Sequence, residues 1–380
     1  MRPTDPWSTA HPMVHAPPRS HTLMRIAAAT LVAPLSLFTA LSLVASATPA
    51  QAQTPLDETT LPTRAEATDW IETSRYADVV SLLETVAAAR ADAHLTTMGY
   101  TFEGRAIPLL VVGVDDPSAE SVMASGKLRV YLQGGIHSGE VPGKEALQML
   151  ARDLAAGRAP VAWTESMVLL IAPLYNADGN ERVRLTNRPR QHGPLAGMGQ
   201  RPNAMGLDLN RDHMKLDSPE ARSVVGMMNR YDPHLSVDLH TTNGSRHGYH
   251  LTYSPPLHPG VAAPVVDLLR GRGLPQVTEG VFDRTGWHTW YYGNARRMPD
   301  GETGWFTFDH RPRFNNNYIG LRNRLAILGE AYSYATFEDR VIATRVFVHE
   351  ILDWAVADAD AIRGAIAEAD ASAVGEVLPT

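Results

Sequence analysis

The stretch "YLQGGIHSGE", residues 131–140, ends an apolar run on two glycines and then offers an imidazole and a carboxylate three residues apart, His137 and Glu140. His240 ends another strand-like run, and Glu330 ends a third. Two imidazoles and one carboxylate around an open fourth position are the ligand set of a catalytic zinc ion. The chain has no cysteine, which excludes thiolate ligands and thiol catalysis. These residue types are compatible with a zinc site. However, H-x-x-E alone is too short a pattern to be specific, and a single histidine is more often an ordinary core or surface residue.

The elements that must position these residues alternate along the chain. Short runs rich in Val and Leu predict buried strands at 106–114, 127–135, 166–180 (running into an Asn/Asp/Gly turn), 235–240 and 324–330. Helical patterns occur in 53–99, from Glu140 to a stop at Gly157, at 218–231 with Ser218 as cap, and over 340–369. This alternation predicts an α/β fold, a three-layer α/β/α sandwich with a mixed, mostly parallel central sheet.

Both histidines and Glu330 fall at or just past the carboxyl ends of predicted strands. In open α/β sheets ligands bind at that edge, so residues far apart in sequence can converge there. Gly134 and Gly135 would let the backbone leave its strand sharply, and Gly139 would let it turn into the next helix. The stretches 180–206 and 284–317 are predicted as long loops, which usually carry function.

A further segment, "RPNAMGLDLNR" at residues 201–211, gathers arginine, asparagine and aspartate where no helix or strand is predicted. With it the chain resembles the zinc carboxypeptidases of the M14 type. Their signature is H-x-x-E, then R-x-N-x-x-G-x-D-x-N-R, then a histidine ending a strand, then a glutamate in a late strand. All four occur here in that order, as "HSGE", "RPNAMGLDLNR", "SVDLH" and "LAILGE", over about residues 100–340.

The resemblance implies a zinc carboxypeptidase-like fold with one zinc ion per chain, bound by His137, Glu140 and His240. It also implies that Asp208 orients His137 from the side away from the metal, a contact that ligating histidines usually need.

The resemblance further makes the chain a metallocarboxypeptidase that hydrolyses C-terminal peptide bonds. Glu330 becomes the general base, which takes a proton from the zinc-activated water and later delivers it to the leaving amine. Arg201 would polarise the scissile carbonyl, while Asn210 and Arg211 would hold the free C-terminal carboxylate of a peptide. Tyr318 is the candidate for the tyrosine that closes over substrate.

Several residues compete for these roles. Glu338 is the rival general base, but it lies past the predicted strand in a pattern typical of a solvated helix start. Tyr291 and Tyr292 are weaker candidates for the closing tyrosine. His247 and His250 form an H-x-x-H without a partner carboxylate at useful spacing, which disfavours a metal role for them.

Two other functions remain open. One is a zinc amidohydrolase of the aspartoacylase and succinylglutamate desuccinylase type, acting on N-acyl amino acids, which also uses H-x-x-E, a D-x-N-R segment and a distant histidine. The separate "RPN" segment and the ending "LGEAYSY" favour the peptidase. The other is a zinc-free binding protein, which is disfavoured because all the catalytic positions are filled. A serine hydrolase is disfavoured because no G-x-S-x-G occurs.

The first part of the chain has the features of a secretory signal peptide. Arg25 precedes an apolar run over 26–47, and Ala-Gln-Ala follows at 50–52. The run is about long enough to span a bilayer, but Pro34 and the Ala-x-Ala ending favour cleavage. Residues 1–52 are therefore expected to be an N-terminal extension and signal peptide.

The expected start is Met24 and the expected cleavage falls before Gln53, which leaves 53–380 as the catalytic domain of an exported, periplasmic or extracellular protein. Removing residues 1–52 takes away three arginines and one aspartate, so 34 − 3 = 31 basic and 41 − 1 = 40 acidic residues remain. A net charge of −9 disfavours nucleic acid as a partner, because phosphate binding requires a basic face. No second long apolar stretch occurs, so no stable membrane insertion is expected after cleavage.

Overall fold

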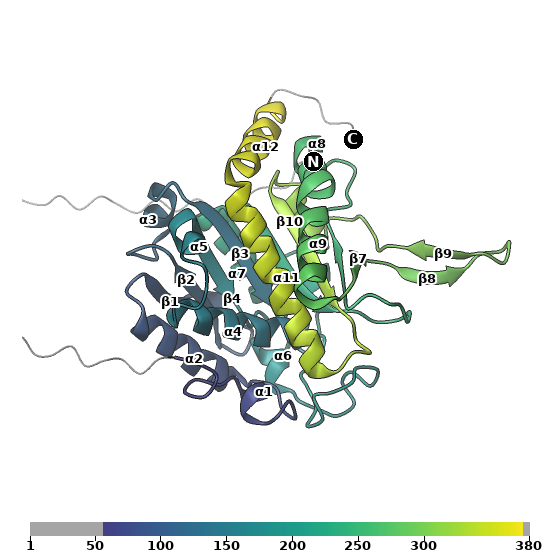
Figure 1. Ribbon diagram of the computed structural model, residues 1–380, viewed down its shortest axis with the longest axis horizontal. Coiled ribbons are helices and arrows are strands. Elements are labelled where there is room, and N and C mark those ends of the chain that lie inside the picture. The colour runs from purple at the N-terminus through teal and green to yellow at the C-terminus, as the bar shows by residue number, and fades with distance from the viewer. Residues whose placement is uncertain (1–55, 375–380) are drawn as a thin grey trace, which may run out of the picture. The chain divides into compact units, whose positions relative to one another are not determined.

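The computed structural model describes residues 56–374 (Figure 1). The expected signal peptide, its start at Met24 and its cleavage before Gln53 lie outside these residues and stay predictions. Within 56–374 no helix is long and apolar enough to cross a membrane.

A mixed eight-stranded sheet forms the middle layer, in the order β1-β2-β4-β3-β5-β10-β6-β7. Its four central strands run parallel to one another, β1 and β2 are antiparallel additions on one side, and β6 pairs antiparallel with β10 on the other. The strands are β1 (Ala93–Tyr100), β2 (Ala106–Val112), β3 (Leu128–Gly134), β4 (Met167–Ala172), β5 (Leu235–Thr241), β6 (Leu251–Ser254), β7 (Thr289–Tyr291) and β10 (Leu325–Ala331). A separate hairpin of β8 (Asn294–Arg297) and β9 (Thr303–Phe306) extends away from this sheet (Figure 1).

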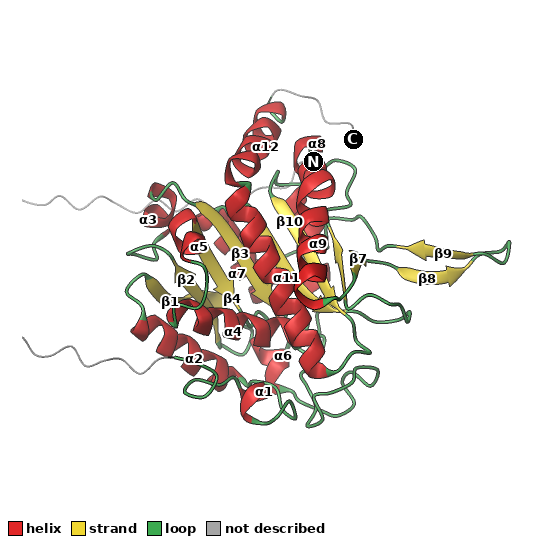
Figure 2. Ribbon diagram, viewed as in Figure 1, coloured by secondary structure: helices red, strands yellow, loops and turns green. Residues whose placement is uncertain are grey.

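Helices cover both faces of the sheet, as Figure 2 shows. One face packs against α2 (Tyr76–Ala89), α4 (Pro142–Ala155), α5 (Val161–Ser166), α9 (Leu274–Thr285) and α11 (Phe337–Ala357). The other packs against α3 (Ala119–Ala124), α7 (Pro219–Tyr231) and α10 (Asn315–Gly320). The remaining α-helices of the described chain are α1 (Arg64–Ala67), α6 (Ala177–Glu181), α8 (Ala263–Leu268) and α12 (Ala359–Ser372), and a π-helical segment, Leu269–Gly273, joins α8 to α9. The predicted three-layer sandwich with a mixed, mostly parallel sheet is confirmed.

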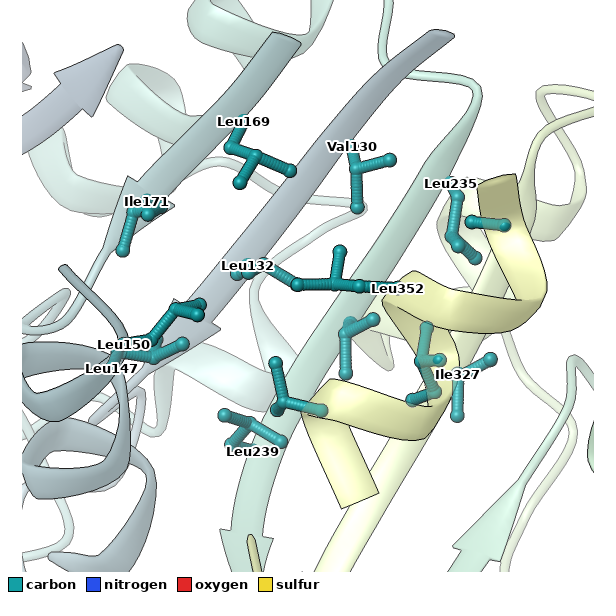
Figure 3. Close-up of a cluster of buried hydrophobic side chains, with 14 of the residues drawn as sticks. Val130, Leu132, Leu147, Leu150, Leu169, Ile171, Leu235, Leu239, Ile327 and Leu352 are labelled. Carbon is teal, nitrogen blue, oxygen red and sulfur yellow. The ribbon is translucent and has the colours of Figure 1, made fainter. Parts of the chain in front are cut away.

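The main core lies between the central strands and the helices α4 and α11 (Figure 3). Alternate residues of each strand point into it, because successive side chains of a strand face opposite sides of the sheet. Its members include Val130, Leu132, Leu147, Leu150, Leu169, Ile171, Leu235, Leu239, Ile327 and Leu352, each at most 1% exposed. Burying one such side chain stabilises the fold by about 1.5–3 kcal/mol. This core holds the carboxyl ends of β3, β5 and β10 in fixed positions.

Most predicted elements are present. The strand runs at 106–114, 127–135, 235–240 and 324–330 are β2, β3, β5 and β10. In α7 the Ser218 side chain accepts a hydrogen bond from the backbone N–H of Ala221, as the cap prediction requires. Helix α4 begins at Pro142 and leaves Glu140 in the loop before it, and it ends before Gly157, whose φ is +68°.

Other segments differ from the prediction. The predicted helical stretch 53–99 ends in the edge strand β1, because its last residues pair antiparallel with β2 and this tertiary pairing overrides the local pattern. The turn expected near residue 180 is the short helix α6, capped by Asn176. The loop expected at 284–317 contains β7 and the hairpin of β8 and β9.

Candidate metal centre

Three neighbouring parallel strands carry the predicted site residues at their carboxyl ends. His240 lies on β5 and Glu330 on β10, and the two residues are direct register partners in the sheet. His137 follows β3 by three residues, and Glu140 lies in the loop that leads into α4. The convergence predicted from strand ends is therefore present, although His240 and Glu330 are 90 residues apart in sequence.

Glycines make the path after β3 possible, in two different ways. Gly135 has a φ of +69°, a left-handed conformation that suits glycine and lets the chain leave the strand sharply. Gly139 is needed for space: a Cβ atom there would lie 2.6 Å from the carbonyl oxygen of Gly199 and 2.9 Å from Cγ of Arg188. Glycine is therefore required at this position because two neighbouring segments approach closely, and not because the backbone turns there as predicted.

The predicted ligands form one buried cluster. Nδ1 of His137 lies 3.0 Å from Oε1 of Glu140, and Nδ1 of His240 lies 2.7 Å from Oε2 of the same carboxylate. One ligand atom from each residue lies within 4.8 Å of the others, and within residues 56–374 no other group of His, Asp and Glu meets this criterion. Two imidazole nitrogens and a carboxylate at this spacing fit a zinc ion.

Nδ1 of each histidine faces Glu140, and Nε2 of each histidine faces a different carboxylate. Nε2 of His137 lies 2.9 Å from Oδ1 of Asp208, the contact that the resemblance implied. Nε2 of His240 lies 2.9 Å from Oδ2 of Asp238, which the sequence did not single out. Asp238 and His240 share a face of β5 because they are two residues apart, so the D-x-H spacing was the available signal.

The charges in this cluster shift its pKa values strongly. Burial alone would lower the pKa of His240, but Asp238 and Glu140 outweigh burial and raise it well above its ordinary value. Burial would raise the pKa of Glu140, yet His137 and Arg188 hold it well below its ordinary value. Glu140 is therefore ionised, as a metal ligand must be, whereas His240 must lose a proton before its Nδ1 atom can bind a metal ion.

Glu330 differs from the other carboxylates because nothing pairs with one of its oxygens. Its Oε2 atom is buried and has no hydrogen-bond partner within residues 56–374. Burial raises its pKa, His240 opposes this, and the nearby carboxylates of Glu140 and Asp238 add to the rise. A cation at the ligand cluster would favour the ionised form again.

Arg201 lies at the edge of the ligand cluster. Its guanidinium donates to Oδ2 of Asp208 through Nε at 3.0 Å and Nη2 at 2.8 Å, while Nη1 lies 3.6 Å from Oε1 of Glu140. Burial lowers its pKa, but these two carboxylates raise it on balance. Arg201 is thus fixed as a cation beside the metal ligands.

Asn210 and Arg211 lie on the 3₁₀ turn Leu209–Arg211. Oδ1 of Asn210 accepts a hydrogen bond of 2.8 Å from the backbone N–H of Asn315. The Arg211 guanidinium packs 4.0 Å above the ring of Phe314 and has no ion pair within residues 56–374. Burial lowers its pKa, which marks a partly dehydrated cation.

One cavity contains nearly all of these residues. It is lined by His137, Glu140, Arg201, Asn210, Arg211, His240, Thr241, Asn243, Tyr292, Phe308, Phe314, Asn316, Leu328 and Glu330. The predicted ligands, the predicted base and all three predicted substrate-contacting polar residues therefore face a common space.

Tyr318 does not line this cavity, which corrects its selection as the closing tyrosine. It lies on α10 with its ring packed against a hydrophobic cluster, and its hydroxyl accepts a hydrogen bond of 3.3 Å from Arg322. Tyr292, a weaker candidate by sequence, does line the cavity, and burial raises the pKa of its hydroxyl.

The rival residues lie elsewhere. Glu338 is exposed in the first turn of α11 and does not line the cavity. His247 packs 4.4 Å from the ring of Tyr332, and His250 stacks 4.6 Å from Trp287, so both belong to an aromatic cluster. Arg188 is a cavity neighbour that no motif indicated, and its Nη2 atom donates to Oε1 of Glu140 at 2.5 Å.

The layered α/β fold with a His–Glu–His cluster at the strand ends defines a metallopeptidase-like architecture. Residues 79–255 match the family model of the zinc carboxypeptidases. The resemblance that the motifs indicated is thereby confirmed for this segment, which is similar to the zinc carboxypeptidases.

Several proteins with similar sequences are named carboxypeptidases. Probable carboxypeptidase 2 of Arthroderma benhamiae is 34% identical over 145 residues, which are 38% of this chain and 24% of that protein. Carboxypeptidase D of Mus musculus is 29% identical over 184 residues, covering 42% of this chain and 13% of that protein. The matched stretch thus spans about a quarter or less of these relatives.

Solved structures share the fold. A metallo-carboxypeptidase from Burkholderia cenocepacia has a TM-score of 0.54 at 18% identity, covering 73% of this chain and 68% of that one. A metallo-carboxypeptidase from Pseudomonas aeruginosa has a TM-score of 0.53 at 19% identity, covering 76% and 70%. Both structures cover a larger share of the chain than the family match does.

Proposed function

We propose that the chain is a zinc-dependent metallocarboxypeptidase that removes the C-terminal residue of peptides, with one zinc ion held by His137, Glu140 and His240. The observation that carries the proposal is the shared cavity, in which a metal-ligand cluster, a carboxylate with an unpaired oxygen and two arginines face each other. When bound, zinc would polarise the scissile carbonyl and acidify a water molecule.

In this proposal, the residues that line the cavity have separate roles in catalysis and substrate binding. Glu330 takes a proton from the attacking water through its unpaired oxygen and gives it to the leaving amine. Arg201, held by Asp208, stabilises the negative charge that develops on the carbonyl oxygen. Asn210 and Arg211 bind the terminal carboxylate, because a partly dehydrated guanidinium without an ion pair favours an anion. Tyr292 closes the cavity over the substrate.

The alternative is an amidohydrolase that acts on N-acyl amino acids. It needs the same metal ligands and the same carboxylate contact, so the cavity alone is compatible with it. The match to the zinc carboxypeptidase family favours peptides. The predicted signal peptide further implies that the protein is exported to the periplasm or the medium. N-terminal sequencing of the exported protein should then give Gln53 as the first residue.

The test compares a peptide that has a free C-terminus with its C-terminal amide and with N-acyl amino acids. If Arg211 binds the terminal carboxylate, amidation removes a charge-assisted hydrogen bond of about 1.5–3 kcal/mol, and kcat/KM should fall at least about tenfold. Arg211→Lys should narrow this gap. Equal hydrolysis of acid and amide would exclude a carboxypeptidase, and cleavage of N-acyl amino acids alone would establish the alternative.

The role of Glu330 is tested with a matched pair of variants. Glu330→Gln should retain zinc and lose about 10²- to 10⁴-fold in turnover, because an amide cannot accept the proton. Glu338→Gln, an exposed glutamate outside the cavity, serves as the control and should keep full activity. The opposite result would assign the base to Glu338.

A further inference from the structure

A second pocket lies beside the metal centre, where the chain continues past β5 and β10. Its volume is about 430 Å³, and its walls are Arg188, Pro189, Arg190, Gln191, Thr242, Asn243, Gly244 and Ser333. Asn243 lines both this pocket and the metal-centre cavity, so the two spaces are neighbours.

Several polar atoms in the walls lack protein partners. Ser333 is 1% exposed, and its Oγ atom has no hydrogen-bond partner within residues 56–374. Both side-chain polar atoms of Gln191 and the Nε atom of Arg188 are also buried and unpartnered in this part of the chain. Buried polar groups are normally paired, so unpartnered polar atoms grouped in this way indicate a binding site for a polar ligand.

The charge of the walls selects the kind of ligand. Arg188 and Arg190 contribute two guanidinium groups, and no Asp or Glu lines the pocket. Arg190 is exposed and makes no ion pair within residues 56–374, so its charge is available. A guanidinium fork beside a hydroxyl and an amide suits a carboxylate.

The position of the pocket decides which part of a peptide reaches it. In the proposed function Asn210 and Arg211 hold the C-terminal carboxylate, and neither lines the second pocket. The leaving residue therefore occupies the space near Phe314. The preceding part of the peptide must pass the metal ligands on the other side, where Asn243 and Arg188 lie.

We propose that this second pocket binds a carboxylate carried by the peptide within two residues on the N-terminal side of the scissile bond. It would make the enzyme selective for acidic peptides. This inference rests on the proposed function and adds a specificity site to it, with Arg190, Gln191 and Ser333 as its contacts.

The test uses peptides that differ only by Glu or Gln at the first or second residue before the scissile bond. At one of these positions the wild type should cleave the Glu peptide at least about tenfold better in kcat/KM, as one charge-assisted hydrogen bond requires. Arg190→Gln should reduce the preference below about threefold and leave kcat/KM for the Gln peptide unchanged. Arg184→Gln, an exposed arginine of the same loop outside the pocket, should keep the preference.

Two results would overturn the specificity site and leave the proposed function intact. The wild type could cleave all peptides without preferring Glu, or Arg190→Gln could keep the full preference. Failure to cleave any peptide while N-acyl amino acids are hydrolysed would overturn both. If Arg190→Gln lowers the melting temperature, Ser333→Ala decides the question: an unchanged ratio of Glu to Gln cleavage in that variant would also refute the site.

Discussion

The replacement Asp238→Asn tests whether the carboxylate behind His240 sets the affinity of the metal centre. Asp238 is 4% exposed, and its two oxygens have different partners: Oδ2 faces Nε2 of His240 at 2.9 Å, and Oδ1 accepts from Nε2 of Gln133 at 2.9 Å. Asparagine has nearly the same shape but carries one oxygen and one nitrogen. A ligating His240 has its hydrogen on Nε2, because its Nδ1 faces the other ligands.

The magnitude follows from how the amide can be oriented. If its nitrogen faces His240, two donors meet and a charge-assisted hydrogen bond of up to about 3 kcal/mol is lost. If its oxygen faces His240, the side chain of Gln133 must turn, and its amide nitrogen then faces the hydroxyl of Tyr131, which at present donates to Gln133 at 2.8 Å. A neutral hydrogen bond then replaces the charged one, at a cost of about 1 kcal/mol. Zinc affinity should therefore fall by about 5- to 150-fold.

The assay is competition for zinc against a fluorescent chelator of known affinity at fixed pH, with circular dichroism to show that the fold is kept. Ser236→Ala is the matched control, since Ser236 lies on the same face of β5, is buried, and has an Oγ atom without a partner in the described chain. It should change zinc affinity less than about twofold. An unchanged affinity in Asp238→Asn, or an equal loss in Ser236→Ala, would refute the reasoning.

Three further changes have defined outcomes. Leu132→Ala should lower the free energy of unfolding by about 2–5 kcal/mol in urea titrations, because it leaves a cavity in the main core. Burial lowers the pKa of His213 to about 4, so the unfolded chain, with a pKa near 6.5, binds more protons below that pH. The contribution of His213 to stability should therefore fall by about 1.4 kcal/mol per pH unit from about pH 6.5 toward 4. His213→Phe should make the pH dependence of the unfolding free energy less steep by that amount. Gly139→Ala should weaken zinc binding in the chelator assay, because its Cβ would lie 2.6 Å from the Gly199 carbonyl oxygen.

The parts of the site that follow strand ends could be predicted from sequence. Buried parallel strands have continuous apolar runs, so the points where those runs end mark one edge of the sheet. His137, His240 and Glu330 were placed by this rule, and the "RPNAMGLDLNR" segment supplied the polar residues that face them across the cavity.

Other parts depend on tertiary packing that no local pattern encodes. Tyr318 and Tyr292 both lie near glycines and aromatic residues in a loop-rich region. Tyr318 packs on α10 against a hydrophobic cluster, whereas Tyr292 lines the cavity, and no local pattern distinguishes the two. Arg188 reaches Glu140 because a glycine leaves room for its side chain. The edge strand β1 forms through pairing with β2, which local propensity does not reveal.

The position of the proposed base is set by the core as much as by the loops. Glu330 is the register partner of His240, and a slip of one residue between β5 and β10 would turn Glu330 away from the cavity. The preceding residue fixes that register from the other face: a Cβ at Gly329 would lie 2.9 Å from Cε1 of Phe347 on α11. Helix α11 therefore packs against the backbone of β10 where only glycine fits. The spacing between metal ligand and base thus depends on a contact in the hydrophobic core, on the face of the sheet opposite the chemistry.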